Sequence, residues 1–373
     1  MNTKTNLGLE QLRDQIDSLD AGIQKLINER AELATVVRAS KSQVADGNDL
    51  QSLDFYRPER EAQVLRKVLE RNEGPLSDAE MLRLFREIMS ACLAQQKTLR
   101  IAYLGPEGTF TQQAVVKQFG HSVQSLAHAT IDDVFTQVES GEADFGVVPI
   151  ENSSQGMVAN TLDRLLTSPL KICAEVELFI HHNLMTNANC LKNIKRVYSH
   201  PQSLAQCQLW LRENLPQAQS IPQASNAAAA KHVRDQHDAA AIAGRNAALI
   251  YDLPILVSSI EDQADNTTRF LVIGRKLCAP SGNDRTTLLM AGNEGPGGLH
   301  ALLQPIAEAG LNMTKIESRP TIRGKWSYVF FMDLDGHADN EPMQTVIRTL
   351  QKRAQLLRVL GAYPKAVEPR QVS

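Results

Sequence analysis

One long apolar seam near the start of the chain constrains the fold more than any other feature of the sequence. Apolar side chains recur there at alternating steps of three and four residues, and they are Leu9, Leu12, Ile16, Leu19, Ile23, Leu26, Leu33 and Val37. This spacing is typical of a helix that packs lengthwise against another helix. We predict helices over about 8–42, 58–72 and 77–98, and the two later ones are too short to cover the first. The seam therefore predicts a dimer in which the long helices of two subunits pair.

The pattern changes from Thr98 onward to short apolar runs separated by helix-like stretches. Such alternation is typical of an α/β domain with parallel strands. It extends to about Lys276, and the segment 277–285, with its Pro, Ser, Gly and Asn, then indicates a linker. The middle of the chain is therefore predicted to be one α/β unit.

The end of the chain shows a third pattern. In order, it predicts a strand, a helix, two strands, a helix and a strand, at 286–291, 297–309, 312–318, 326–333, 341–353 and 356–360. The βαββαβ order is typical of a ferredoxin-like α+β fold. We therefore divide the chain into an all-α domain at 1–98, an α/β domain at 99–277 and an α+β domain at 285–365.

Composition excludes several classes of function. The 373 residues include 39 basic and 42 acidic ones, a net charge of −3, and no basic block that could follow a nucleic-acid backbone. We expect no membrane span, because no stretch approaches about 20 apolar residues, and the first residues lack a leader-like pattern, so we expect a cytoplasmic protein. Disulfides and structural zinc are not expected either, because no Cys-x-x-Cys pair occurs. We expect reduced and mostly buried thiols at Cys92, Cys173, Cys190, Cys207 and Cys278.

Charged residues interrupt the apolar seam of the first helix. Arg30 stands where an apolar residue is expected, and Lys41, about three turns later, projects from nearly the same face. Arg13 is rotated by roughly 100° and could reach the site of a neighbouring subunit. These residues could form interfacial ion pairs, such as Arg30 with Glu61. Alternatively, they could together bind a small anion with several charges.

The pattern resembles the all-helical chorismate mutases in Arg13, Arg30 of NERAELA, Lys41, Arg60 and Glu61 of REAQVL, and Gln96. The resemblance implies an intertwined dimer in which arginines bind the two carboxylates of chorismate and Arg13 comes from the partner subunit. The rearrangement needs no nucleophile, so the site holds the compact substrate and stabilises charge on the breaking ether oxygen. Lys41 and Gln96 would donate to that oxygen, and Glu61 would bind the ring hydroxyl. Cys92, a further candidate contact, stands where serine is expected, and Arg57 where a carboxylate is expected.

Polar clusters lie beside the predicted strands of the middle domain. Ligands of α/β sheets bind beyond the carboxyl ends of strands, and helix starts favour anions. Each cluster also has a purely structural interpretation, since Arg269 could pair with Glu151 and His200 could cap a helix. The candidate site residues are Thr109, Phe110, Glu151, Asn152, Ser153, Ser199, His200, Gln202, Gln206, Thr268, Arg269 and Phe270.

In this order, GPEGTF, PIENSSQG, YSHPQ, AIAGRNAALIYDL and NTTRF resemble prephenate dehydratase over nearly all of 100–275. The resemblance implies two lobes, like a periplasmic binding protein, with prephenate between them and Arg269 on a carboxylate. The ring hydroxyl leaves as carbon dioxide departs, which makes the ring aromatic and requires neither a metal nor an organic cofactor. The Thr268 hydroxyl would help that hydroxyl leave. Glu151 is the other candidate proton donor, if a closed cleft raises its pKa.

Two glycines open the predicted helix of the last domain, and Glu-Ser-Arg-Pro ends its second strand. These motifs resemble the ACT domain of prephenate dehydratases, which binds phenylalanine between paired domains. The resemblance implies feedback inhibition. It also implies effector contacts at Gly297, Gly298, Leu299, His300, Leu311, Asn312, Glu317, Ser318, Arg319 and Pro320.

Two other functions fit parts of the sequence. The first is a monofunctional dehydratase whose helices only dimerise, but a pure dimerisation helix would carry Leu or Ile at Arg30 and Lys41. The second is a non-catalytic sensor of small molecules. Release of carbon dioxide from prephenate would exclude the sensor.

Overall fold

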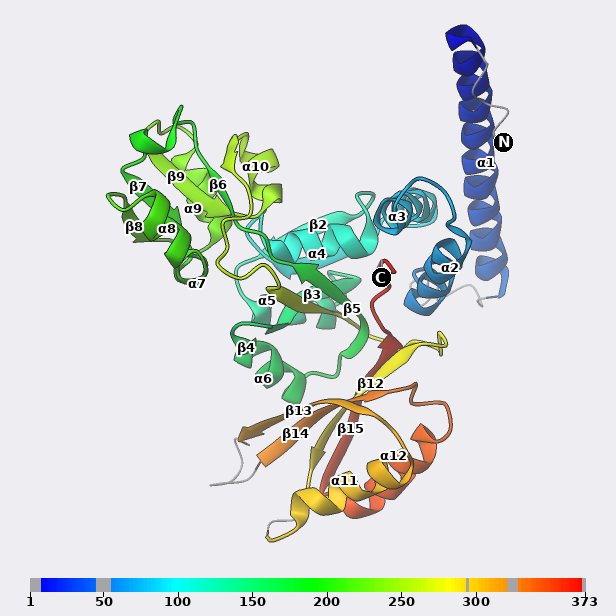
Figure 1. The fold of residues 1–373 in the computed structure, drawn as a ribbon. Coiled ribbons are helices and arrows are strands. Elements are labelled where there is room, and N and C mark those ends of the chain that lie inside the picture. Colours follow the sequence, from blue (N-terminus) through cyan, green and yellow to red (C-terminus); the bar gives the residue numbers. More distant parts are fainter. Residues whose placement is uncertain (1–7, 45–54, 293–294, 321–327, 371–373) are drawn as a thin grey trace.

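Three regions of different architecture follow one another along the chain in the computed structural model (Figure 1). The structure describes residues 8–44, 55–292, 295–320 and 328–370, without the side chains of Arg38 and residues 41–44. No described helix is both long and apolar enough to cross a membrane.

The first region, the helical domain, consists of three helices. They are α1 (Leu9–Val44), α2 (Pro58–Arg71) and α3 (Asp78–Ala94). All three predicted helices are confirmed, but α3 ends before the predicted end at 98. Asp144 accepts hydrogen bonds from the Lys97 ammonium (2.7 Å) and the Arg100 N–H (2.9 Å), and these bonds turn the chain into the first strand.

The middle region forms two lobes, each built on its own sheet. The sheet of the first lobe has the order β2-β1-β3-β11-β5, with β4 paired to β3. The strands of this lobe are β1 (Arg100–Leu104), β2 (Gln124–His128), β3 (Phe145–Asn152), β4 (Gly156–Met157), β5 (Lys171–Phe179) and β11 (Thr267–Gly274). Its helices are α4 (Phe110–Phe119), α5 (Ile131–Glu139) and α6 (Ala159–Thr167).

The second lobe is an insertion between β5 and β11. Its sheet has the order β10-β6-β9-β7-β8. The strands are β6 (Asn183–Met185), β7 (Arg196–Ser199), β8 (Gln219–Pro222), β9 (Ala239–Ala243) and β10 (Ile255–Val257). The helices are α7 (Pro201–Gln206), α8 (Gln208–Asn214), α9 (Asn226–Val233), α10 (Arg245–Tyr251) and the short 3-10 turn Leu191–Asn193.

Both sheets are mixed, so the prediction of parallel strands was wrong in part. β11 runs antiparallel to β3 and β5, and β6 runs antiparallel to β9 and β10. The chain leaves the first lobe at Phe179 and returns from the second lobe at Thr267, directly opposite Phe179 in the sheet. Because β11 starts where β5 ends, it must run in the opposite direction.

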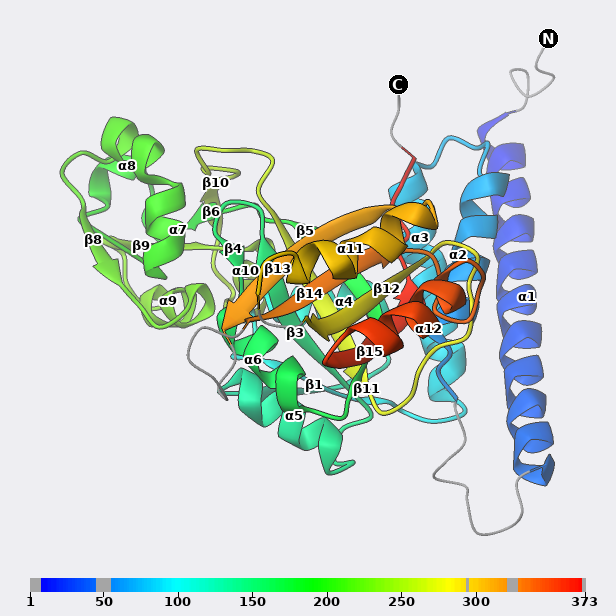
Figure 2. The same cartoon turned by 90° about the horizontal axis from the view of Figure 1, so that it is seen from below.

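The C-terminal domain has the predicted βαββαβ order. Its elements are β12 (Asp284–Ala291), α11 (Gly298–Glu308), β13 (Met313–Pro320), β14 (Tyr328–Asp335), α12 (Met343–Arg353) and β15 (Leu356–Pro364). The strands form an antiparallel sheet in the order β13-β14-β12-β15. The helices α11 and α12 cover one face of this sheet, and the first lobe lies against the other (Figures 1 and 2).

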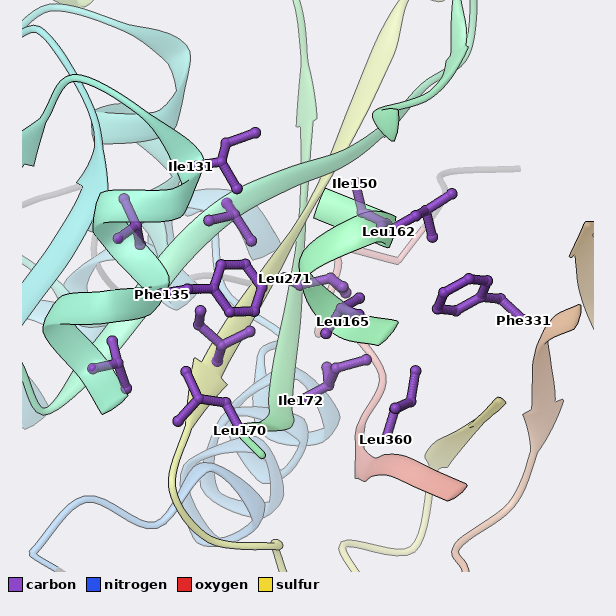
Figure 3. Close-up of a cluster of buried hydrophobic side chains, with 14 of the residues drawn as sticks. Ile131, Phe135, Ile150, Leu162, Leu165, Leu170, Ile172, Leu271, Phe331 and Leu360 are labelled. Atoms are coloured by element: carbon purple, nitrogen blue, oxygen red, sulfur yellow. The ribbon is translucent and has the colours of Figure 1, made fainter. Parts of the chain in front are cut away.

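The first lobe and the C-terminal sheet share one hydrophobic core (Figure 3). Phe331 and Leu360 of the C-terminal sheet belong to the same buried cluster as Leu165 and Ile172 of the first lobe. The strands β15 and β5 approach so closely that a Cβ atom at Gly361 would lie 2.3 Å from the Ile172 carbonyl oxygen. Glycine at this position is therefore a condition of the contact.

Segments that flank the C-terminal domain also contact the helical domain. The predicted linker at 277–285 is packed, because Cys278 is buried and Arg66 of α2 donates to the Asn283 carbonyl at 2.8 Å. After β15 the chain returns to α3, where the Arg370 guanidinium donates to the Asp78 carboxylate at 2.7 Å. Four of the five cysteines are buried as expected, and Cys190 is exposed.

Candidate functional sites

The apolar seam of α1 is uncovered in the single chain. Leu19, Leu26 and Leu33 are 66%, 65% and 67% exposed, although their spacing is that of a packed helix. Only one side of α1 lies against α2 and α3 (Figure 2). The free side has the length and pattern that the sequence predicts for a helix pair.

The candidate residues on α1 lie near the border of that free side. Arg30 is half-buried, together with Ile27 and Ala34, and Arg13 is exposed. Lys41 lies in the last turns of α1, but its side chain is outside the described residues. The ion pairs of the described residues do not include Arg30 with Glu61, so that predicted pair is not formed in one chain.

The candidate residues on α2 point in different directions. Arg60 is exposed, and Glu61 is half-buried beside Arg86 and the Tyr56 hydroxyl. Burial raises the pKa of Glu61 to about 7, against the opposing effects of Arg86 and Tyr56. Tyr56 in turn accepts a hydrogen bond from Gln118 of α4 at 2.9 Å, so Glu61 lies toward the first lobe.

The two remaining candidates of the helical domain lie on α3 and in the turn after it, and neither is exposed. Cys92 is buried, and Gln96 is half-buried in the turn after α3, where its N–H donates to the Leu93 carbonyl. Within one chain, the described side chains among the seven candidates of the helical domain therefore do not surround a common point.

The loop before α4 contacts the second lobe, and Phe110 contributes an aromatic ring to this contact. Thr109 caps α4, accepting from the Gln112 N–H, and Phe110 follows it. The Phe110 ring lies edge-on to the His182 ring, with 5.7 Å between centroids. A Cβ atom at Gly244 would lie 2.7 Å from the same ring. Phe110 therefore bridges the two lobes.

Asn152 and Thr268 form a pair at the edge of the first lobe. They are direct partners in the register of β3 and β11, and the Asn152 amide donates to Thr268 Oγ1 at 2.8 Å. The same amide donates to Asn266 Oδ1 at 2.8 Å, and the Ser153 hydroxyl contacts that oxygen at 3.4 Å. A threonine hydroxyl that accepts in this way keeps its own proton for another acceptor.

Register separates this pair from the neighbouring charged pair. Side chains alternate between the two faces of a sheet, so Glu151 and Arg269, which are also direct partners, lie on the face opposite to Asn152 and Thr268. That opposite face carries the C-terminal domain, because Arg269 contacts Asp333 of β14 there. The predicted dehydratase residues are thus divided between two faces of one sheet.

The division corrects three expectations. The Arg269 guanidinium binds Asp333 at 2.7 Å and Glu175 at 3.0 Å, so it faces the C-terminal domain and not the second lobe. It also lies 4.0 Å from Glu151, which confirms the structural interpretation that these two residues pair. Phe270 is 2% exposed and belongs to the core, which leaves it no surface for a ligand. The Glu151 carboxylate is ion-paired with Lys315, so it faces the C-terminal domain and lies on the opposite face of the sheet from Thr268.

The second lobe supplies polar groups from two helix starts. The Ser199 hydroxyl donates to the Ile242 carbonyl at 2.7 Å and also lies 2.9 Å from Asn226 Oδ1, which accepts from the His200 N–H at 3.1 Å. His200 Nδ1 accepts from the Gln202 N–H at 3.4 Å, so His200 does cap a helix, and its burial lowers its pKa. Asn226 was missed from the sequence, although it too follows a strand and starts a helix.

His182, where the chain first crosses between the lobes, was also missed. It is 1% exposed, and its Nε2 lies 2.8 Å from the Gln206 side-chain oxygen. Burial lowers its pKa, which favours the neutral ring. Among the described residues, His182 Nδ1 is one of the buried polar atoms without a partner. Its position between two apolar runs gives no sequence signal beyond the pair His181–His182.

The candidate effector residues are also divided between two faces. Along β13, Lys315, Glu317 and Arg319 are half-buried, whereas the residues between them are exposed. Arg319 binds Asp163 of α6 at 2.7 Å, so this face of β13 rests on the first lobe. Ser318 and Pro320 are exposed on the other face.

The remaining effector candidates flank α11. Gly297 has a φ of +85°, which favours glycine, and it starts α11. Leu299 and His300 are exposed on the first turn. Leu311 is half-buried beyond the helix, and the Asn312 amide donates to Asp335 at 2.9 Å. Within the described residues, no group of three or more His, Cys, Asp or Glu side chains is arranged to hold a metal ion.

Comparison with known proteins assigns a family to each of the three regions. The family models Chorismate mutase type II, Prephenate dehydratase and ACT domain match residues 12–97, 101–277 and 286–351. A bifunctional chorismate mutase/prephenate dehydratase of Pseudomonas aeruginosa is 48% identical over 360 residues, which cover 96% of this chain and 98% of that protein.

Two solved structures resemble the middle and C-terminal regions. A prephenate dehydratase of Arthrobacter aurescens in complex with L-Phe has a TM-score of 0.67 and 34% identity, covering 74% of this chain and 93% of that one. GqqA, described as a novel type of quorum quenching acylase, has a TM-score of 0.66 and 30% identity, covering 72% of this chain and 98% of that one.

Proposed function

This chain belongs to the family of bifunctional chorismate mutase/prephenate dehydratases, and from that premise we propose that one polypeptide catalyses two consecutive reactions. The first converts chorismate to prephenate, and the second converts prephenate to phenylpyruvate with loss of water and carbon dioxide. Phenylalanine, bound by the ACT domain, inhibits the pathway that makes it. The proposed domain boundaries are 1–98, 99–277 and 285–365.

For the dehydratase reaction we propose a site between the two lobes that is built on the Asn152–Thr268 pair. The bond to the ring carboxylate breaks, its electron pair makes the ring aromatic, and the ring hydroxyl leaves. The Thr268 hydroxyl accepts from Asn152 and has its proton available for that leaving group. Phe110 and Gln206 belong to the same interlobe site as contacts of the substrate. Ser199 is 0% exposed, so it has no surface for the substrate. The hydrogen-bonded Asn152–Thr268 pair is the observation that carries the proposal.

For the mutase reaction we propose a site shared by two copies of the chain. The exposed seam of α1 has the pattern of a helix pair, and one chain leaves the candidate groups apart. In the proposed homodimer, Arg13 of one subunit completes the site formed by Arg30, Lys41, Arg60 and Gln96 of the other. Glu61 belongs to the proposed site as the partner of the ring hydroxyl. Cys92 is buried within one chain and is assigned no contact with the substrate. We also propose that the enzyme is cytoplasmic, which fractionation of cells would test.

For the ACT domain we propose a phenylalanine site at the start of α11 and along β13. Among the described residues no side chain caps the start of α11, and N–H groups at a helix start suit a carboxylate. The exposed Ser318 and Pro320 lie on the outer face of β13. Inhibition then requires that phenylalanine bind more tightly to a less active form of the enzyme.

Neither alternative function gains support from the geometry. A monofunctional dehydratase does not require the half-buried Arg30 on the helix seam. An acylase that uses a hydroxyl nucleophile requires a base within hydrogen-bond reach. Here the Ser199 hydroxyl donates to a backbone carbonyl and His200 Nδ1 accepts from a backbone N–H, so these two residues form no such pair.

The experiment is to supply chorismate to the purified protein and to follow prephenate and phenylpyruvate, with and without phenylalanine. Thr268→Ala should lower the dehydratase kcat by about 100-fold or more, the usual contribution of a general acid, and should change KM much less. Mutase activity of the same variant is the control and should be unchanged. An unchanged dehydratase kcat would remove Thr268 from the reaction.

A further inference from the structure

Two residues of the ACT domain contact the sheet of the first lobe on the face opposite to the proposed dehydratase residues. Glu151 and Arg269, each next to a residue of the Asn152–Thr268 pair, face the ACT domain, and the pair itself lies on the opposite face of the sheet. The Lys315 ammonium of β13 is ion-paired with Glu151. Each strand that carries a proposed dehydratase residue is therefore anchored, one residue away, by a charge on the other side of the sheet.

The second anchor, on Arg269, is a largely buried network of ion pairs and hydrogen bonds. Arg269 NH1 binds Asp333 Oδ2 at 2.7 Å, and the other Asp333 oxygen accepts from the Thr287 hydroxyl at 2.6 Å. Thr287 is also 2.9 Å from the Tyr363 hydroxyl, which accepts from Arg269. Burial by itself would lower the pKa of Arg269, but Tyr363 and the carboxylates of Asp333 and Glu175 raise it above its ordinary value. A buried charge in such a network cannot lose one partner without leaving another unpaired.

The same strand that carries Lys315 carries the proposed effector motif. Glu317 follows Lys315 by two residues on the same face, and Arg319, two residues further, binds Asp163 of α6 at 2.7 Å. Because adjacent positions of a paired strand move together, a displacement of β13 at the effector motif also displaces the Lys315 ammonium. Arg285 of β12 is a further cation of this network. It is ion-paired with Glu175, the same carboxylate that Arg269 contacts.

We propose that Lys315 and Asp333 are positioning residues of the dehydratase site and connect it to the phenylalanine site. They act through Glu151 and Arg269 on the Asn152–Thr268 pair, and neither touches the substrate. Phenylalanine then changes the dehydratase rate by changing how β13 holds Glu151. The inference rests on the proposed function, because it assigns Asn152 and Thr268 to the dehydratase reaction.

The test compares Lys315→Met and Asp333→Asn with wild type in the full-length enzyme. Dehydratase kcat and KM are measured with and without phenylalanine, and calorimetry measures phenylalanine binding separately. Both variants should lose at least about fivefold in kcat, and phenylalanine should bind but reduce the remaining rate at least about fivefold less than in wild type, the lower range of coupling between sites. Lys315→Arg, which keeps the charge, should restore both quantities. Mutase activity should stay at the wild-type value.

The matched control is Arg348→Met, because Arg348 forms an ion pair with Glu341 (2.6 Å) that stays within the ACT domain. It should behave as wild type. Wild-type kcat and wild-type inhibition in both Lys315→Met and Asp333→Asn would overturn the inference, as would equal losses in Arg348→Met. If Thr268→Ala is impaired while these variants are normal, only this inference fails. If Thr268→Ala is normal, the proposed function of the site fails as well.

Discussion

The surface of α1 and the boundary between the dehydratase lobe and the ACT sheet are both rich in apolar side chains, but they differ in what covers them. At the boundary, Phe331 and Leu360 are buried in a core that the two domains share (Figure 3). Along α1, Leu19, Leu26 and Leu33 remain about two-thirds exposed. Burial of apolar side chains is the main stabilising contribution to such contacts. The boundary between the lobe and the ACT sheet already has this burial, whereas the seam of α1 does not.

The difference indicates how the two activities depend on assembly. The ACT sheet is fixed to the dehydratase lobe within one chain by a shared core and by buried ion pairs such as Arg269 with Asp333. The helical domain presents an exposed apolar seam that no other described part of the chain covers. We therefore expect mutase activity to require the dimer and dehydratase activity to require only the folded chain. The following predictions test that contrast, from the largest expected effect to the smallest.

The largest effect should follow from charging the α1 seam with Leu19→Glu and Leu26→Glu together. Burying two carboxylates in an apolar helix pair costs several kcal/mol, so the dimer should dissociate and mutase activity should fall by about 100-fold or more. Dehydratase kcat should stay within about twofold of wild type. Sedimentation measures the dissociation of the dimer, and assays with chorismate and with prephenate measure the two activities. Lys25→Gln, on an exposed ion pair of the same helix, is the control. A fully active mutase in a monomeric variant would refute the shared site.

A smaller effect should follow from Gly361→Ala at the other boundary. The new Cβ would lie 2.3 Å from the Ile172 carbonyl oxygen, so β15 must move away from β5. Overpacking of this kind typically costs about 1–3 kcal/mol. We expect a lower melting temperature and phenylalanine inhibition weakened about tenfold, with mutase activity unchanged. Gly74→Ala, where a Cβ meets nothing within 4 Å, is the control. Normal inhibition with a normal melting temperature would show that β15 does not need to lie against β5.

The smallest effect concerns Glu61 and pH. Burial raises the pKa of Glu61 to about 7, above its unfolded value of 4.5, so the folded state holds this proton more tightly. The contribution of Glu61 to stability is therefore largest below pH 4.5 and is lost as the pH rises through about 7. Glu61→Gln, which mimics the protonated carboxyl, should gain stability relative to wild type as the pH rises from 5 to 8. Melting curves at both pH values measure this, and a variant that loses stability relative to wild type over this range would contradict the sign.

The sequence predicted the elements better than it predicted which way their side chains face. Periodicity sufficed for the helices and for the βαββαβ order, because a repeating apolar face needs no knowledge of its partner. The orientation of Arg269 could not be predicted, since it depends on a register between β3 and β11, which are far apart in sequence. The roles of Asn226 and His182 were missed for a related reason, because their partners come from other elements. Phe270 was misassigned because a motif residue next to a site can equally belong to the core.

The most direct test of the contrast between the two activities is subunit complementation. Arg13→Ala and Arg30→Ala are purified separately, and each should be nearly inactive as a mutase and normal as a dehydratase. When the two are mixed and allowed to exchange subunits, half of the dimers are mixed, and each mixed dimer contains one complete site, so mutase activity should rise to about a quarter of wild type. Dehydratase activity should not change on mixing. If mutase activity in the mixture stays at the level of the separate variants although mixed dimers form, each site is built from one chain and the account is wrong.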